Sequence, residues 1–149
     1  MKLIAAASLR LSGYAWTALT SPSFHIARRV FDYDVNPLPV ISTIPSMEDA
    51  AQTRYKNNSV NLPIAFTCLL AIEDGKDVHA ICEPILGEME TALFAAGPLT
   101  IAGIDDTYFA FNYLGGGVVD YPDELGPAEI LITISAEILY SKVAGDPCN

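Results

Sequence analysis

The sequence predicts a single α+β domain with a largely antiparallel sheet and helices packed on one side of it. Two kinds of hydrophobic spacing support this prediction. Apolar residues recur every three or four positions near the amino terminus and again after Asp77, which is typical of helices. Elsewhere they alternate with polar residues or form short runs between prolines and glycines, which is typical of strands. The expected order is helix, three strands, helix and two strands.

The first half of the chain should contain the first helix and two short strands. Residues 3–19 should form the helix, which Pro22 would end. Strands should follow at residues 24–33 and 40–44, the second of them bounded by prolines. Residues 46–59 are mostly polar, so they should form a surface loop or the arm of a long hairpin, where interactions are often made.

The centre of the chain should supply the middle of the sheet and the second helix. Residues 60–72 are the most apolar stretch and should form a central strand. A helix is expected over residues 78–96, capped by Asp77 and stopped by Gly97. Pro84 inside that helix predicts a kink, because it removes one backbone hydrogen bond.

The last third alternates apolar and polar residues and should form two antiparallel strands. One strand should run through Phe111 and the other over residues 130–140. Between their alternating segments, Gly115, Gly116 and Gly117 permit a β-bulge or a flexible bend. The sequence alone assigns these glycines no further role.

Length and cysteine content are those of one domain without a disulfide framework. A chain of 149 residues can bury a core of its own. The domain is expected to span residues 1–140, and the polar residues 141–149 should form a tail outside the core. The spacing of the three cysteines fits neither a disulfide framework nor a metal site, so reduced thiols are expected at Cys68, Cys82 and Cys148.

The charge is unevenly distributed along the chain. The net charge is -10, yet residues 1–72 hold six Lys or Arg and four acidic residues, whereas residues 73–149 hold two Lys and fourteen acidic residues. Such an acidic chain should not bind nucleic acid tightly, because that affinity comes from Lys and Arg. The two halves could attract each other or a neighbouring copy. The longest apolar run, residues 62–72, is too short for a transmembrane helix, so no membrane association is expected.

No pattern of catalytic or metal-binding residues is evident. His25 and His79 are the two histidines, and neither lies in a recognisable motif. Cys82 lies three residues from His79, but it belongs to the apolar stripe of its helix, so a buried thiol is favoured over a Cys–His pair. The acids at residues 105–106 and 120–124 lack the spacing of a calcium loop. We therefore expect no enzymatic activity, no metal and no cofactor.

The chain resembles the phage tail terminator family, the tail completion proteins related to minor tail protein U. The resemblance lies in the order of elements, in the stretch Leu-Pro-Val-Ile-Ser-Thr-Ile-Pro-Ser at residues 38–46 and in the closing Tyr140-Ser141. The resemblance covers nearly the whole chain. It implies a virion protein, assembled in the host bacterial cytoplasm, that forms a hexameric ring at the head-proximal end of the tail tube. The ring would end tube polymerisation, join a neck or head-completion protein and let DNA pass without specific binding.

Two alternatives to a terminator remain open from the sequence. The chain could be another head-tail connector, neck or tail tube protein. It could also be a small cytoplasmic ligand-binding domain or enzyme, which a deep pocket containing a histidine would favour. Under the terminator interpretation, charged residues spread along the chain are candidates for contacts between subunits or with partners. They are Arg10, Arg28, Arg29, Glu48, Asp49, Arg54, Lys56, Asp120, Asp123, Glu124, Lys142 and Asp146.

Overall fold

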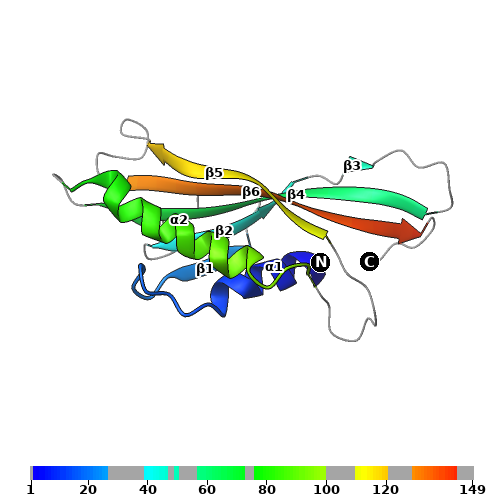
Figure 1. Ribbon diagram of the computed structural model, residues 1–149, viewed down its shortest axis with the longest axis horizontal. Helices are drawn as coiled ribbons and strands as arrows, with labels where there is room; N and C mark the ends of the chain where they lie inside the picture. The colour runs from blue at the N-terminus through cyan, green and yellow to red at the C-terminus, as the bar shows by residue number, and fades with distance from the viewer. Residues whose placement is uncertain are drawn as a thin grey trace.

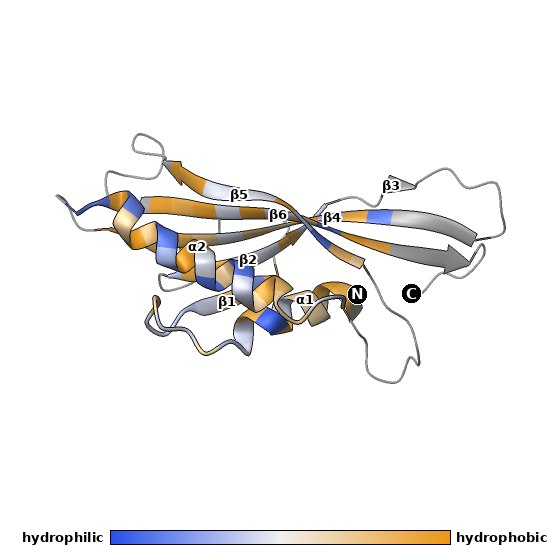
Figure 2. Cartoon of the chain, in the orientation of Figure 1, coloured by the Kyte–Doolittle hydropathy of each residue, from blue (hydrophilic) through white to orange (hydrophobic). Residues whose placement is uncertain are grey.

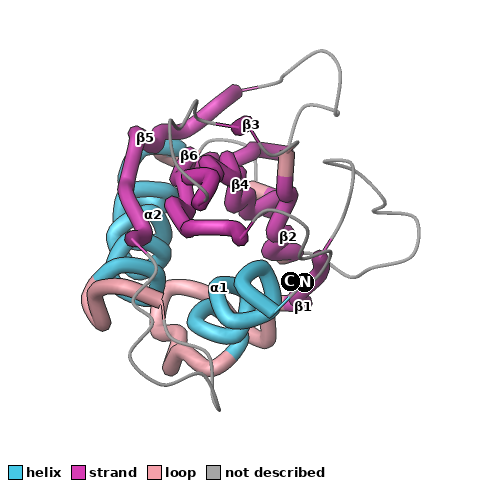
Figure 3. The backbone as a smooth tube through the Cα atoms, turned by 90° about the vertical axis from the view of Figure 1, so that its right-hand side faces the viewer, coloured by secondary structure: helices cyan, strands magenta, loops and turns pink. Residues whose placement is uncertain are grey.

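The computed structural model describes residues 2–26, 39–46, 49–50, 57–72, 76–99, 110–120 and 129–143. The described elements are one sheet and two helices packed against one of its faces (Figures 1 and 3), which confirms the predicted α+β class. In chain order they are α1 (Lys2–Ser12), β1 (Ser23–Ile26), β2 (Val40–Pro45), β3 (Asp49–Ala50), β4 (Asn57–Ala71), α2 (Val78–Phe94), β5 (Ala110–Asp120) and β6 (Glu129–Val143).

The sheet is largely antiparallel, as predicted. Its strand order is β1-β2-β4-β6-β5, and β3 pairs with β4 beyond the end of β2. The pairs β2–β4, β4–β6 and β6–β5 are antiparallel, whereas β1 runs parallel to β2. Among the described strands, β1 and β5 therefore form the two outer edges of the sheet.

Helix α1 is shorter than expected. The prediction of a helix over residues 3–19 was wrong at its carboxyl end, because α1 stops before Gly13. Glycine disfavours a continued helix, and the carbonyl oxygen of Leu11 at the helix end accepts hydrogen bonds from the Tyr14 amide at 3.3 Å and from the indole nitrogen of Trp16 at 2.9 Å. The following loop still contributes the buried side chain of Leu19 to the core.

Helix α2 begins as the sequence predicts. The carboxylate of Asp77 accepts hydrogen bonds from the amides of His79 and Ala80, at 3.1 and 3.4 Å, and so caps the helix. The helix continues on both sides of Pro84, which lies on its exposed side, where water can bond the carbonyl that loses its partner. It ends before Gly97, whose φ of +73° is readily adopted by glycine.

The hydrophobic core lies between the two helices and one face of the sheet (Figure 2). Every second residue of β4 from Leu62 to Leu70, and of β6 from Ile130 to Ile138, points into it. Each fully buried apolar side chain contributes roughly 1.5–3 kcal/mol. The most buried members are Ile41 of β2, Leu62, Ile64, Phe66 and Cys68 of β4, Ile132, Ile134, Ala136 and Ile138 of β6, Ala7 and Leu11 of α1, Cys82, Ile85, Met89 and Leu93 of α2, and Leu99 after α2.

Strands β4 and β6 pair along their full length of fifteen residues, from Asn57 opposite Val143 to Ala71 opposite Glu129. Strand β2 flanks β4 only from Ile64 onward, and β5 flanks β6 only as far as Leu139. The pairs formed by residues 57–60 and 140–143 thus extend beyond the ends of β2 and β5, and among the described strands only the short β3 lies beside them. We call these residues the ribbon; it projects past both helices, to the right in Figure 1.

The ribbon corrects two expected boundaries. Residues 57–59 belong to β4, which fits the hairpin arm and not the surface loop that the sequence allowed for residues 46–59, and residues 141–143 belong to β6, although the sequence placed them in a tail. Both segments are polar, so hydrophobic alternation does not reveal them. Their pairing rests on continuation of the backbone ladder from the buried centre of the two strands.

The glycine run lies inside β5. The pairing register with β6 shifts between Tyr113 and Gly115, which leaves Leu114 as an extra residue and confirms the predicted bulge. Gly115 has a φ of +151°, which side chains rarely adopt. Beyond the bulge the strand continues to pair with β6 through Gly116 and Gly117.

Candidate functional site

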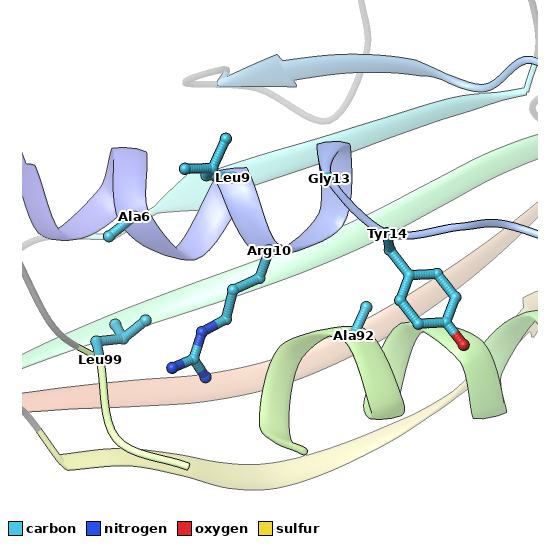
Figure 4. A pocket seen from close by; sticks show the side chains of 7 residues that line it. All are labelled: Ala6, Leu9, Arg10, Gly13, Tyr14, Ala92 and Leu99. Carbon is cyan, nitrogen blue, oxygen red and sulfur yellow. The ribbon is translucent and has the colours of Figure 1, made fainter. Parts of the chain in front are cut away.

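Arg10 joins the two helices (Figure 4). Its guanidinium donates to the carbonyl oxygens of Leu93 at 2.6 Å, Gly97 at 2.7 Å and Pro98 at 2.8 Å. These carbonyls lie at the carboxyl end of α2, where free acceptors and the negative end of the helix dipole favour a cation. The guanidinium carbon also lies 5.7 Å from the centre of the Phe111 ring. Arg10 was a candidate partner contact, and the structure shows that its guanidinium is bonded within the chain.

A shallow groove of about 420 Å³ lies between α1 and α2 beside this arginine (Figure 4). Its lining is mainly small or apolar, and Arg10 is the one charged residue in it. Tyr14 adds a phenol ring at the rim. Neither histidine lines this groove, so it does not provide the histidine-containing pocket that would favour an enzyme. The lining residues are Ala6, Leu9, Arg10, Gly13, Tyr14, Ala92 and Leu99.

The two described cysteines are buried in the core. Cys68 and Cys82 are each 0% exposed. Burial, with a smaller contribution from the neighbouring Cys82, raises the pKa of the Cys68 thiol to about 12. Burial also raises the pKa of Cys82. Both thiols are therefore protonated at neutral pH, and the exposed His79 does not share the environment of Cys82.

Within the described ranges, no three His, Cys, Asp or Glu side chains gather closely enough to hold a metal ion. Asp120 is the last residue of β5, whereas the acids at 105–106 and 121–124 lie outside those ranges. No helix that the structure describes is long and apolar enough to cross a membrane.

Three further candidate contact residues lie in strands. Asp49 is in β3, and Lys142 is in the ribbon opposite Asn58, so both belong to the same end of the sheet. Asp120 pairs with Ile130 at the other end of β6. The remaining candidates lie outside the described residues: Arg28, Arg29, Glu48, Arg54, Lys56, Asp123, Glu124 and Asp146.

Glu88 of α2 forms hydrogen bonds with the loop after α1, which the sequence did not indicate. Its carboxylate accepts hydrogen bonds from the amide and hydroxyl of Thr17 and, at 2.8 Å, from the amide of Ala18. Burial of the carboxyl group acts to raise its pKa, but these hydrogen bonds outweigh it, so the pKa of Glu88 is lowered. No local motif predicts this contact, because its partners are about seventy residues apart.

A second unforeseen contact joins α2 to β5. The Tyr113 hydroxyl donates to Glu90 at 3.0 Å, and its ring meets Phe94 edge to face, with 5.5 Å between ring centres. Partial burial and the Glu90 carboxylate raise the pKa of Tyr113. The side chain nevertheless remains half exposed at the edge of the sheet.

Exposed apolar side chains concentrate on β5 and its neighbour. Tyr113 and Leu114 of β5 and Leu139 of β6 are exposed, the most open of them Leu114 at 57%. Leu9 of α1 and Ile26 of β1 are exposed elsewhere. Single exposed apolar residues are ordinary, and Tyr113 and Leu139 point to opposite faces of the sheet, so these side chains do not form one patch.

A scan against models of protein families finds no match to this chain, and a search of curated proteins finds none either.

Proposed function

We propose that this chain is a structural virion protein of a tailed phage, a tail terminator that assembles into a six-membered ring at the head-proximal end of the tail tube. The ring would stop tube polymerisation and offer a surface to a neck or head-completion protein. The proposal rests on the family resemblance of the sequence, and the structural feature that supports it most is the ribbon.

The ribbon is built in a way that suits a subunit of an assembly. Its four residue pairs extend roughly 13 Å beyond the last pair between β5 and β6, at about 3.3 Å per residue. Two-stranded ribbons are marginally stable alone in water. A ribbon that projects past the helices is therefore best stabilised by docking on another surface, and a neighbouring subunit or the tube end would supply one.

The charge distribution fits a ring with unlike contact surfaces. A closed ring of identical subunits uses heterologous interfaces, in which two different patches of the chain meet. The net positive first half and the strongly negative second half of the sequence provide patches of opposite sign. An acidic ring would also let DNA pass without holding it, since DNA affinity requires basic residues.

The test is the mass of the purified protein by light scattering over a range of concentrations, with negative-stain microscopy of the same samples. We expect closed six-membered rings with a central hole, or a monomer that forms such rings when mixed with purified tail tubes lacking their terminator. Open tubes of unlimited length would replace the proposal with a tube protein. A monomer that neither forms rings nor caps tubes would refute it.

A further inference from the structure

We draw no further inference here: the strongest candidate, the shallow groove between α1 and α2, is lined mainly by small and apolar side chains, the Arg10 guanidinium beside it is already bonded to carbonyl oxygens of the same chain, and nothing in the part of the chain that the structure describes shows what covers it.

Discussion

The hydroxyl oxygen of Tyr113 lies 3.1 Å from the point that a Cβ atom of Gly116 would occupy. Ile134 and the Thr133 carbonyl crowd the same point at 3.2 Å. The missing side chain at Gly116 lets the Tyr113 ring lie along the strand and reach Glu90 on α2. The middle glycine of the run is thus closely surrounded, while its neighbour Gly117 is not crowded.

This contact predicts different effects for neighbouring substitutions. Gly116→Ala should lower the free energy of unfolding by about 1–3 kcal/mol, because an added methyl group overpacks the site. Gly117→Ala should leave it unchanged or raise it by up to about 1 kcal/mol, since the added Cβ meets no atom and restricts the unfolded chain. Urea unfolding of both variants measures the difference. Equal destabilisation would show that the Tyr113 contact does not restrict position 116.

Arg10 should contribute to stability through the end of α2. Replacing it with Met keeps much of the apolar stem and removes three hydrogen bonds to carbonyl oxygens. The carbonyls are partly accessible to water, so we expect a loss of about 1–3 kcal/mol. Lys76→Met, which removes the charge of an exposed residue, is the matched control and should change the free energy of unfolding little. A loss as large for Lys76→Met as for Arg10→Met would indicate a general charge effect instead.

Glu88 should make stability depend on pH in the acid range. The pKa of Glu88 is lowered in the folded protein. Its contribution to the free energy of unfolding is therefore fully present above the pKa of about 4.3 in the unfolded chain, and it is lost as pH falls through the lower pKa of the folded protein. The thermal midpoint of Glu88→Gln should therefore fall less than that of the unmodified protein between pH 5 and strongly acidic conditions. Glu83→Gln, on the exposed side of the same helix, is the control and should follow the unmodified protein. Parallel curves for all three proteins would contradict the assigned role of Glu88.

Elements that bury an apolar face could be predicted from the sequence, whereas their ends depended on other forces. A continuous apolar run located the centre of β4, alternation located that of β6, and the Asp77 cap located the start of α2. The carboxyl end of α1 was missed because Tyr14 and Ala18 extend its apolar stripe beyond Gly13. Periodicity records which residues are apolar and not which backbone hydrogen bonds form.

The candidate contact residues were less predictable than the fold. Arg10 was selected for its charge, and the structure uses that charge at the end of a helix distant in sequence. Glu88 and Tyr113 were not selected, because their partners come from other elements and no local spacing relates them. The extension of β6 to residues 141–143 was missed for a similar reason, since cross-strand pairing holds it there.

The buried thiols allow a test of the core that is independent of assembly. Cys68 and Cys82 are 0% exposed, and burial raises the pKa of Cys68 to about 12, so neither should react with iodoacetamide in the native protein even at pH 9, above the ordinary thiol value of about 8.5. Both should react in denaturing urea, as mass spectrometry of digested protein would show. The protein treated in urea supplies the control for reagent access. Rapid native labelling of Cys82 would mean that α2 separates from the sheet easily, and it would reopen the case for a reactive cysteine beside His79.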